Sequence, residues 1–322
     1  VVPSSQNCSE GGWCPLLKDE LLDKDTHFQK ALLADLVVLQ QVVAPLQAWA
    51  STELRDLPWR RSRNPWHILV SEVMLQQTQV SRVIGRYQEF LTRFPTAASC
   101  AEAPSSAVIA LWAGLGYNRR VVNLWRAAKR VVEEHDGCLP TERDALLALP
   151  GIGPYTARAI QAFAFEDDVA VVDTNVGRLL ARWTGNRLTP KYAQYLADEL
   201  LPSGNGWVWN QSLFDFAVAV CTKSEPACAE CPLQESCNWK GEGEDPATNS
   251  AGVSTKQSPF DGSDRQVRGR LVDALRRSPI DMNKLVCYGR PTDSAGDVKR
   301  LAESLISDGL AVCRGGWLML PD

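Results

Sequence analysis

The sequence predicts an all-α body followed by a small C-terminal α/β module. Apolar residues recur at helical spacing through most of the first 221 residues, and short Gly and Pro connectors separate the runs. No stretch there resembles a series of alternating strands. The predicted helical runs are 28–50, 66–95, 105–134, 142–149, 154–165, 174–185, 190–202 and 209–221.

The last 60 or so residues predict a separate module behind a linker. The stretch 239–263 is rich in Gly, Ser, Asp, Glu and Pro and almost lacks apolar residues, which is typical of a flexible linker. Helical patterns at 264–277, 281–288 and 295–308 then precede two short apolar segments, 311–313 and 317–320, with two glycines between them as in a hairpin turn. Three helices and a hairpin indicate a winged-helix-like module.

Composition predicts a folded, soluble protein without a membrane span. Hydrophobic residues make up 45% of the 322 residues and charged residues 22%, and no apolar run approaches the roughly 18 to 20 residues that cross a bilayer. The extension 1–27 is acidic and lacks the basic and apolar regions of a secretory signal, so we expect no export.

Charge is unevenly distributed along the chain. The net charge of −4 argues against a protein that coats nucleic acid nonspecifically. Residues 56–130, however, hold eleven Arg and Lys side chains against four acidic ones. This segment predicts a polyanionic partner; the alternative is a set of solvated helix faces.

Four of the ten cysteines crowd together near the end of the helical body. Cys221, Cys228, Cys231 and Cys237 form the pattern C-x6-C-x2-C-x5-C, whereas the other six are scattered. Four thiolates at such short spacings can hold a tetrahedral zinc or a four-iron cluster, and spacing alone does not decide between them. The pattern favours a metal site in a reducing compartment over disulfides or unrelated buried cysteines.

Two glycines lie between two helical runs, in the segment L-P-G-I-G-P-Y-T-A at 149–157. Gly151 and Gly153 would allow backbone N–H groups to converge at a helix N-terminus, where they can bind a phosphate. An ordinary turn between helices is the alternative.

Two carboxyl groups have surroundings that suit opposite roles. Glu72 lies within an apolar and amide-rich helical run, which predicts a raised pKa and a retained proton. Asp173 lies just before another helix, where the positive end of the helix dipole favours its charge; the simplest interpretation is an N-cap. Cleavage of a glycosidic bond needs such a protonated acid and such a carboxylate.

The glycine hairpin, the downstream Asp173 and the four cysteines, in this order, resemble the helix-hairpin-helix glycosylases that include endonuclease III, over roughly residues 30 to 238. The segments L-P-W-R at 57–60, S-E-V-M-L-Q-Q-T-Q-V at 71–80, G-L-G-Y at 114–117 and N-Q at 210–211 resemble the adenine glycosylases within that superfamily. The resemblance implies a two-lobed fold at 28–238, with a barrel lobe at about 58–170 and a cluster lobe at about 28–57 and 171–238.

The resemblance also implies the cofactor and the chemistry. The cysteines would bind a 4Fe–4S cluster rather than zinc. Glu72 would protonate the adenine, Asp173 would stabilise the sugar cation, and water would complete the hydrolysis. Tyr155 stands where bifunctional members carry a lysine that forms a Schiff base, so we expect little strand cleavage.

Further residues are implied to contact the DNA. Gln77 and Tyr117 would enter the base stack so that the adenine can be flipped out, and Gly151 and Gly153 would contact a phosphate. The remaining members of this expected set are Trp59, Arg60, Leu75, Thr78, Asn175 and Gln211, of which Trp59, Arg60, Leu75 and Gln211 would line the adenine pocket.

The expected function is therefore monofunctional removal of adenine mispaired with 8-oxoguanine or guanine in double-stranded DNA, by a monomer in the bacterial cytoplasm, at the nucleoid. The short module at 264–322 departs from the Nudix-like domain that many members carry. Two alternatives stay open: a thymine glycosylase for G/T mismatches, and a noncatalytic iron–sulfur DNA-binding protein.

Overall fold

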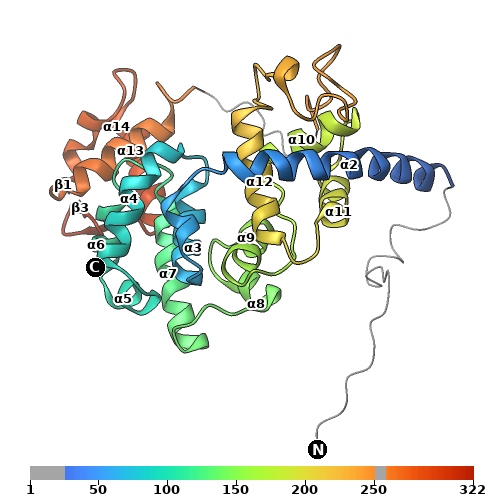
Figure 1. Cartoon of the computed structure of the whole chain (residues 1–322). Coiled ribbons are helices and arrows are strands. Elements are labelled where there is room, and N and C mark those ends of the chain that lie inside the picture. The colour runs from blue at the N-terminus through green and yellow to red at the C-terminus, as the bar shows by residue number, and fades with distance from the viewer. Residues whose placement is uncertain (1–25, 251–258) are drawn as a thin grey trace, which may run out of the picture.

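The structure is a computed structural model that describes residues 26–250 and 259–322. It confirms the predicted fold class, since helices make up nearly all regular structure (Figure 1). The helices of the body are α2 (Thr26–Glu53), η2 (Pro58–Arg61), α3 (Pro65–Leu75), α4 (Val80–Arg93), α5 (Ala97–Glu102), α6 (Ser105–Leu111), α7 (Arg119–His135), α8 (Arg143–Ala148), α9 (Pro154–Ala164), α10 (Thr174–Thr184), α11 (Pro190–Leu200), α12 (Gly206–Ala219) and η3 (Cys228–Glu230).

Two predicted helical runs are each broken in the middle. The run 66–95 is divided into α3 and α4, and the run 105–134 into α6 and α7. Gln77 and Tyr117 lie at the breaks with φ of 54° and 45°, in the left-handed region that non-glycine residues rarely adopt. Helical periodicity continues across both breaks, so it could not reveal them. The short helix α5 was not predicted.

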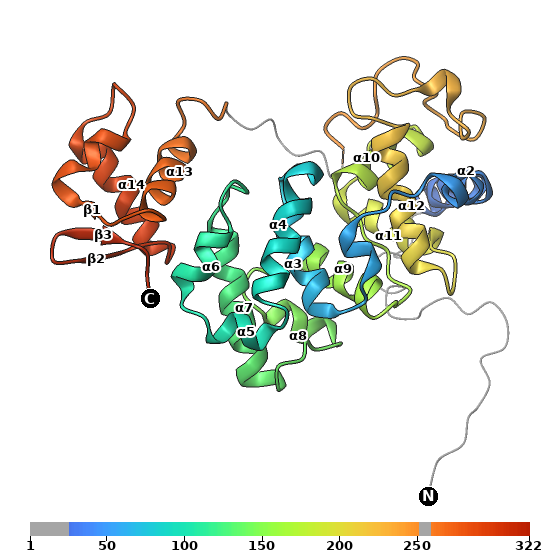
Figure 2. The ribbon, with the colours of Figure 1, turned by 60° about the vertical axis from the view of Figure 1, so that its left-hand side comes forward.

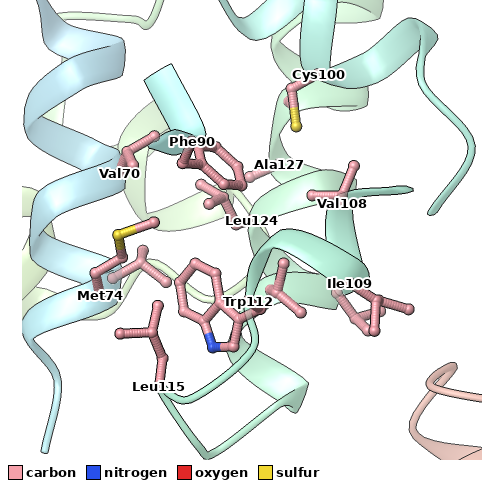
Figure 3. Close-up of a cluster of buried hydrophobic side chains, with 14 of the residues drawn as sticks. Val70, Met74, Phe90, Cys100, Val108, Ile109, Trp112, Leu115, Leu124 and Ala127 are labelled. Carbon is pink, nitrogen blue, oxygen red and sulfur yellow. The ribbon is translucent and has the colours of Figure 1, made fainter. Parts of the chain in front are cut away.

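The body contains two hydrophobic cores. The first gathers side chains from Leu57 to Val171, among them Phe90 and Trp112, which pack with Val70, Met74 and Leu124 in Figure 3. The second gathers α2 with α10, α11 and α12 (Figure 1). The chain thus begins with α2 in the second lobe, forms the first lobe with residues 57–171, and then returns to the second lobe.

Helix α2 lies along the second lobe. Leu39, Val42 and Leu46 are fully buried against its neighbours, while Leu33 and Val37 are more than half exposed. Within the described residues, 30–53 has the length and apolar composition of a membrane-crossing helix. The expectation that no apolar run approaches that length was wrong, because this helix is apolar beyond the face that it buries.

The C-terminal module contains α13 (Asp264–Leu275), η4 (Met282–Tyr288), α14 (Ala295–Ser307) and a small antiparallel sheet in the order β1 (Ile280–Asp281), β3 (Trp317–Met319), β2 (Val312–Arg314). The predicted hairpin is β2–β3. The module lies beside α6 (Figure 2), and its apolar residues join the first core. The Ser106 amide donates to Pro321 O (3.1 Å), and Arg276 bonds to Ile109 O (3.2 Å) and Asn118 Oδ1 (3.1 Å).

The predicted linker 239–263 needs correction at its start. Residues 239–250 pack on the second lobe, because Asp245 pairs with Arg182 (2.7 Å) and the Ser250 hydroxyl accepts from the Leu188 amide (2.8 Å). Polar composition suggested a linker, but here the polar groups bond to the lobe. The extension 1–25 and residues 251–258 lie outside the described residues.

Candidate active site

Glu72 lies in α3, whose start is defined by Asn64 and Pro65. The Asn64 side chain accepts from the Trp66 and His67 amides, and Pro65 occupies the first turn, where no N–H is needed. Glu72 is 6% exposed. Burial raises the pKa of Glu72 to about 7, and the charge of Asp173 acts in the same direction, while a hydrogen bond from Tyr155 opposes the shift. The predicted raised pKa is confirmed.

Tyr155 is in the first turn of α9. Its hydroxyl hydrogen-bonds to Glu72, and burial together with the charges of Glu72 and Asp173 holds the pKa of Tyr155 well above its usual value. It is therefore a neutral donor to Glu72 across the pH range of enzyme action. A phenol in this state cannot act as the amine of a Schiff base.

Asp173 caps α10, as its position predicted. Its Oδ1 accepts from the Asn175 and Val176 amides (both 2.8 Å), and its Oδ2 accepts from the Asn175 side chain (2.7 Å). Burial nevertheless raises the pKa of Asp173, against these hydrogen bonds and the positive charge of Arg178. The N–H groups at the helix N-terminus favour the charged form, as expected, but the effect of lost solvent is larger. That Asp173 stays ionised at neutral pH stays a prediction.

The structure thus brings together Glu72, Tyr155 and Asp173, which come from α3, α9 and the start of α10. The backbone before Asp173 is fixed by Asn210, which accepts from the Val171 amide (2.8 Å) and donates to Val169 O (2.9 Å). One carboxyl that holds a proton near neutrality beside another that accepts three N–H bonds suits acid-assisted cleavage of a glycosidic bond.

Gln77 and Tyr117, the residues predicted to enter the base stack, lie on two loops that hydrogen bonds from Arg120 connect. These two loops are called the wedge loops below. Arg120 donates to Val73 O (2.7 Å) and Met74 O (3.1 Å), and to Gln76 O, on the side of Gln77. The same guanidinium donates to Leu115 O, Gly116 O and the Thr78 hydroxyl (3.0–3.1 Å). Burial lowers the pKa of Arg120 to about 10, so it stays cationic at neutral pH. Sequence reasoning missed this residue, since nothing in its spacing separates it from a surface arginine.

The two hairpin glycines differ in whether a residue with a side chain could replace them. Gly151 has φ of 80°, and an added Cβ would lie 2.8 Å from the Cβ of Asn123. Gly153 has φ of −98°, and nothing lies within 4 Å of an added Cβ, so a side chain would fit there. Gly153 offers no side chain to cap α9. No side chain in the described ranges caps the first amides of α9, and their contact with a phosphate stays a prediction. Only Gly151 occupies a position that requires glycine.

The residues predicted to line the adenine pocket are distributed differently. Trp59 is buried and packs edge-on against Tyr87 (5.7 Å between ring centroids), and Gln211 is 5% exposed on α12. Leu75 is partly buried against the first core. Arg60 places both terminal nitrogens on Asp215 (2.6 and 2.8 Å), while its buried Nε has no hydrogen-bond partner in the described part of the chain. Their role in base recognition stays a prediction.

Asn175 and Thr78 have internal partners in this structure. Asn175 bonds to Asp173 through its amide nitrogen and accepts from Arg178 through its oxygen (3.0 Å). The Thr78 hydroxyl bonds to Arg120. Both side chains therefore orient functional neighbours, and their contact with DNA stays a prediction.

The four cysteines line one open pocket, with Arg182 on its wall. A tetrahedral zinc would hold its sulfurs about 4 Å apart, and within the described ranges no three His, Cys, Asp or Glu residues are arranged to hold one metal ion. A four-iron cluster instead needs the thiolates around a space, since each binds a different iron. Gly241 lets the chain pass close to Cys228, because an added Cβ would lie 2.9 Å from its sulfur. The residues fit such a cluster.

Arg182 is a second residue that sequence reasoning missed. It is 1% exposed, lies 3.3 Å from the sulfur of Cys221, and stacks over Trp239 at 4.5 Å. Its charge offsets part of the negative charge that four thiolates bring. The signal in the sequence was the pair Arg178 and Arg182, one helical turn apart in an otherwise apolar helix.

Two helical lobes with a carboxyl pair between them and a glycine hairpin beside it define a DNA base-excision glycosylase. Residues 70–203 match the HhH-GPD superfamily of base excision DNA repair proteins. A thermostable thymine-DNA glycosylase superimposes with a TM-score of 0.60 at 28% identity, over 64% of this chain and 97% of that one. Endonuclease III bound to DNA has a TM-score of 0.57 at 22% identity, over 63% of this chain and 96–97% of that one, which shows the shared fold.

Comparison with individual relatives identifies the family within this superfamily. The adenine DNA glycosylase of Mycolicibacterium smegmatis is 39% identical over 272 residues, which cover 82% of this chain and 90% of that protein. The human adenine DNA glycosylase is 37% identical over 221 residues, 64% of this chain and 40% of the human one. The chain belongs to the adenine DNA glycosylases, enzymes of base excision repair.

Proposed function

We propose that this enzyme hydrolyses the N-glycosidic bond of adenine mispaired with 8-oxoguanine or guanine in duplex DNA and leaves an abasic site. The observation that carries the proposal is the contact of Glu72 with Tyr155 beside Asp173. Glu72, with a pKa of about 7, supplies a proton to the departing adenine. The base must leave the stack to reach this acid, which the Gln77 and Tyr117 loops would assist.

Asp173 acts on the sugar. Positive charge that develops on the sugar as the bond breaks favours the carboxylate form, and so opposes the effect of burial on Asp173. Its three N–H donors hold the carboxylate in place. Water then adds to the sugar. Because Tyr155 supplies no amine, the enzyme is monofunctional and leaves the strand intact.

The four cysteines are proposed to hold a 4Fe–4S cluster in the second lobe. When bound, the cluster supplies a crosslink that ties 221–237 to the lobe. Arg182 supports this assignment through its position beside Cys221. We further propose that the enzyme acts as a monomer on DNA in the bacterial cytoplasm, where thiolates stay reduced.

Single-turnover excision on a panel of duplexes tests the proposal. The substrates carry A opposite 8-oxoguanine, A opposite guanine, T opposite guanine, or undamaged pairs, and the product is read as alkali-dependent strand scission. We expect A opposite 8-oxoguanine to react fastest, with little scission before alkali. Fastest reaction of T opposite guanine would reassign the base, in line with the likeness to a thymine-DNA glycosylase. No reaction on any duplex would support a noncatalytic protein.

A further inference from the structure

A broad groove of about 980 Å³ separates the wedge loops from the C-terminal module. One wall contains Gln77 and Tyr117, and the other wall is α13 with part of α14. The proposed function uses Gln77 and Tyr117 on one wall of this groove but no residue of the C-terminal module. Its width and its position beside Tyr117 suggest a long partner rather than a small molecule.

The charge of the groove is strongly one-sided. Six arginines line it against one acidic residue, Asp273, and the six are Arg82, Arg119, Arg120, Arg265, Arg268 and Arg276. Asp273 pairs with Arg276, and Asp308 pairs with Arg268 and more loosely with Arg119 (3.6 Å). Arg82 makes no ion pair among residues 26–250 and 259–322, and Arg120 bonds to uncharged groups. The groove therefore keeps a net positive charge, which suits a polyanion.

A direct hydrogen bond joins the module to the wedge. Arg265, in the first turn of α13, donates to the Tyr117 hydroxyl at 2.9 Å. Tyr117 is 39% exposed. If Tyr117 enters a base stack, then the start of α13 must lie against the same duplex or move away from Tyr117. The module is held to the first lobe by a shared core and by Arg276, which favours contact over displacement.

We propose that the C-terminal module is part of the DNA-binding surface, and that the groove between α13 and the wedge loops holds the sugar–phosphate backbone of the substrate duplex. Arg265 and Arg82 contact phosphates from opposite walls. Such contacts position the enzyme without reading sequence. This inference rests on the proposed function, because it takes the Gln77 and Tyr117 loops as the part that enters DNA.

The test measures the affinity of the full chain for a fluorescein-labelled duplex over a range of KCl concentrations. The duplex carries a tetrahydrofuran abasic-site analogue opposite guanine, so that no excision occurs. Each lost phosphate contact should reduce the slope of log affinity against log salt by about 0.9. We expect this reduction, with weaker binding, for Arg265→Gln and for Arg82→Gln. In the described ranges no hydrogen bond, ion pair or cation–π contact joins Arg82 to Tyr117, so the Arg82 variant keeps the Arg265–Tyr117 hydrogen bond.

Arg277→Gln is the matched control, because Arg277 is exposed in the same module and does not line the groove. It should keep the wild-type slope, and Arg265→Lys should restore the slope that Arg265→Gln loses. Circular dichroism checks that each variant is folded. Slopes equal to that of Arg277→Gln would overturn the proposal. Tighter binding by Arg265→Gln would also overturn it and identify the module as a cover over Tyr117.

Two separate measurements distinguish failure of the proposed function from failure of the groove proposal. Wild-type excision on the mismatch panel tests the chemistry, whereas the salt slope is measured without any reaction. Reduced slopes together with no adenine excision would reject the proposed activity and keep the groove as a DNA site. Normal adenine excision with unchanged slopes would keep the activity and reject the groove.

Discussion

Glu72 and Asp173 both carry a carboxyl group, but Glu72 lies inside one helix and Asp173 lies just before the start of another. Glu72 lies inside α3, where the backbone N–H groups are used within the helix, so its one identified donor is the Tyr155 hydroxyl. Asp173 precedes α10, where amide groups are unpaired, and it accepts from two of them and from Asn175. Burial raises the pKa of both, but three hydrogen bonds to the charged form oppose the shift at Asp173, against one at Glu72. Position along a helix therefore decides how many backbone donors favour the carboxylate form.

Glu72→Gln gives the largest expected effect. Glutamine keeps the size of the side chain but has no proton to give to the leaving base. Single-turnover excision of adenine opposite 8-oxoguanine should fall by about 10²- to 10⁴-fold, as for loss of a general acid. Glu89→Gln is the matched control, since Glu89 is an exposed glutamate paired with Arg86 in the same lobe. Wild-type excision by Glu72→Gln would show that another group supplies the proton.

Asp173→Asn should reduce excision nearly as strongly while leaving α10 capped. Asparagine is as good an N-cap as aspartate, so the melting temperature should change little. The missing charge should lower single-turnover excision by about 10²- to 10³-fold, as for loss of an electrostatic contact in a buried site. Asp173→Ala separates the roles, because it should also lose about 1 kcal/mol of stability. Equal stability of the Asn and Ala variants would remove the capping role.

The raised pKa of Glu72 also predicts how stability changes with pH. The folded-state pKa of Glu72 is about 7, above the ordinary 4.5, so the folded protein binds the proton more tightly than the unfolded chain. Its stabilising contribution is full below pH 4.5 and is lost as pH rises through 7. Relative to the wild type, Glu72→Gln should gain up to about 3 kcal/mol of unfolding free energy between pH 5 and pH 8. Urea unfolding at both pH values measures this difference, and a constant difference would contradict the raised pKa.

The sequence predicted correctly those features that depend on residues close together in the chain. Asp173 before a helical run predicted the cap, and apolar surroundings predicted the raised pKa of Glu72; both are confirmed. Two short apolar segments around Gly315 and Gly316 likewise predicted the hairpin of the small module. These features depend on neighbours in sequence, so the chain itself displays them.

Features that depend on distant partners were not visible in the sequence. The contacts of Arg120 come from two segments about forty residues apart. The break at Tyr117 contains Gly114 and Gly116, both with positive φ, whereas the break at Gln77 has no neighbouring glycine or proline that could reveal it. Residues 239–250 looked like a linker because their partners, such as Arg182 and Leu188, lie some sixty residues away.

Tyr155→Phe gives the smallest effect and the sharpest test of the comparison. Loss of the hydroxyl removes the hydrogen bond that lowers the pKa of Glu72, so that pKa should rise further. One hydrogen bond corresponds to about one pH unit or less. The alkaline limb of single-turnover excision should therefore move upward by that amount, and the variant should lose less of its rate than the wild type between pH 7 and pH 8. Tyr192→Phe is the control, because it removes a hydroxyl that bonds to Asp35 in the second lobe. A limb that moves downward would mean that Tyr155 favours the protonated form of Glu72, which would make the two carboxyl groups more alike than their surroundings indicate.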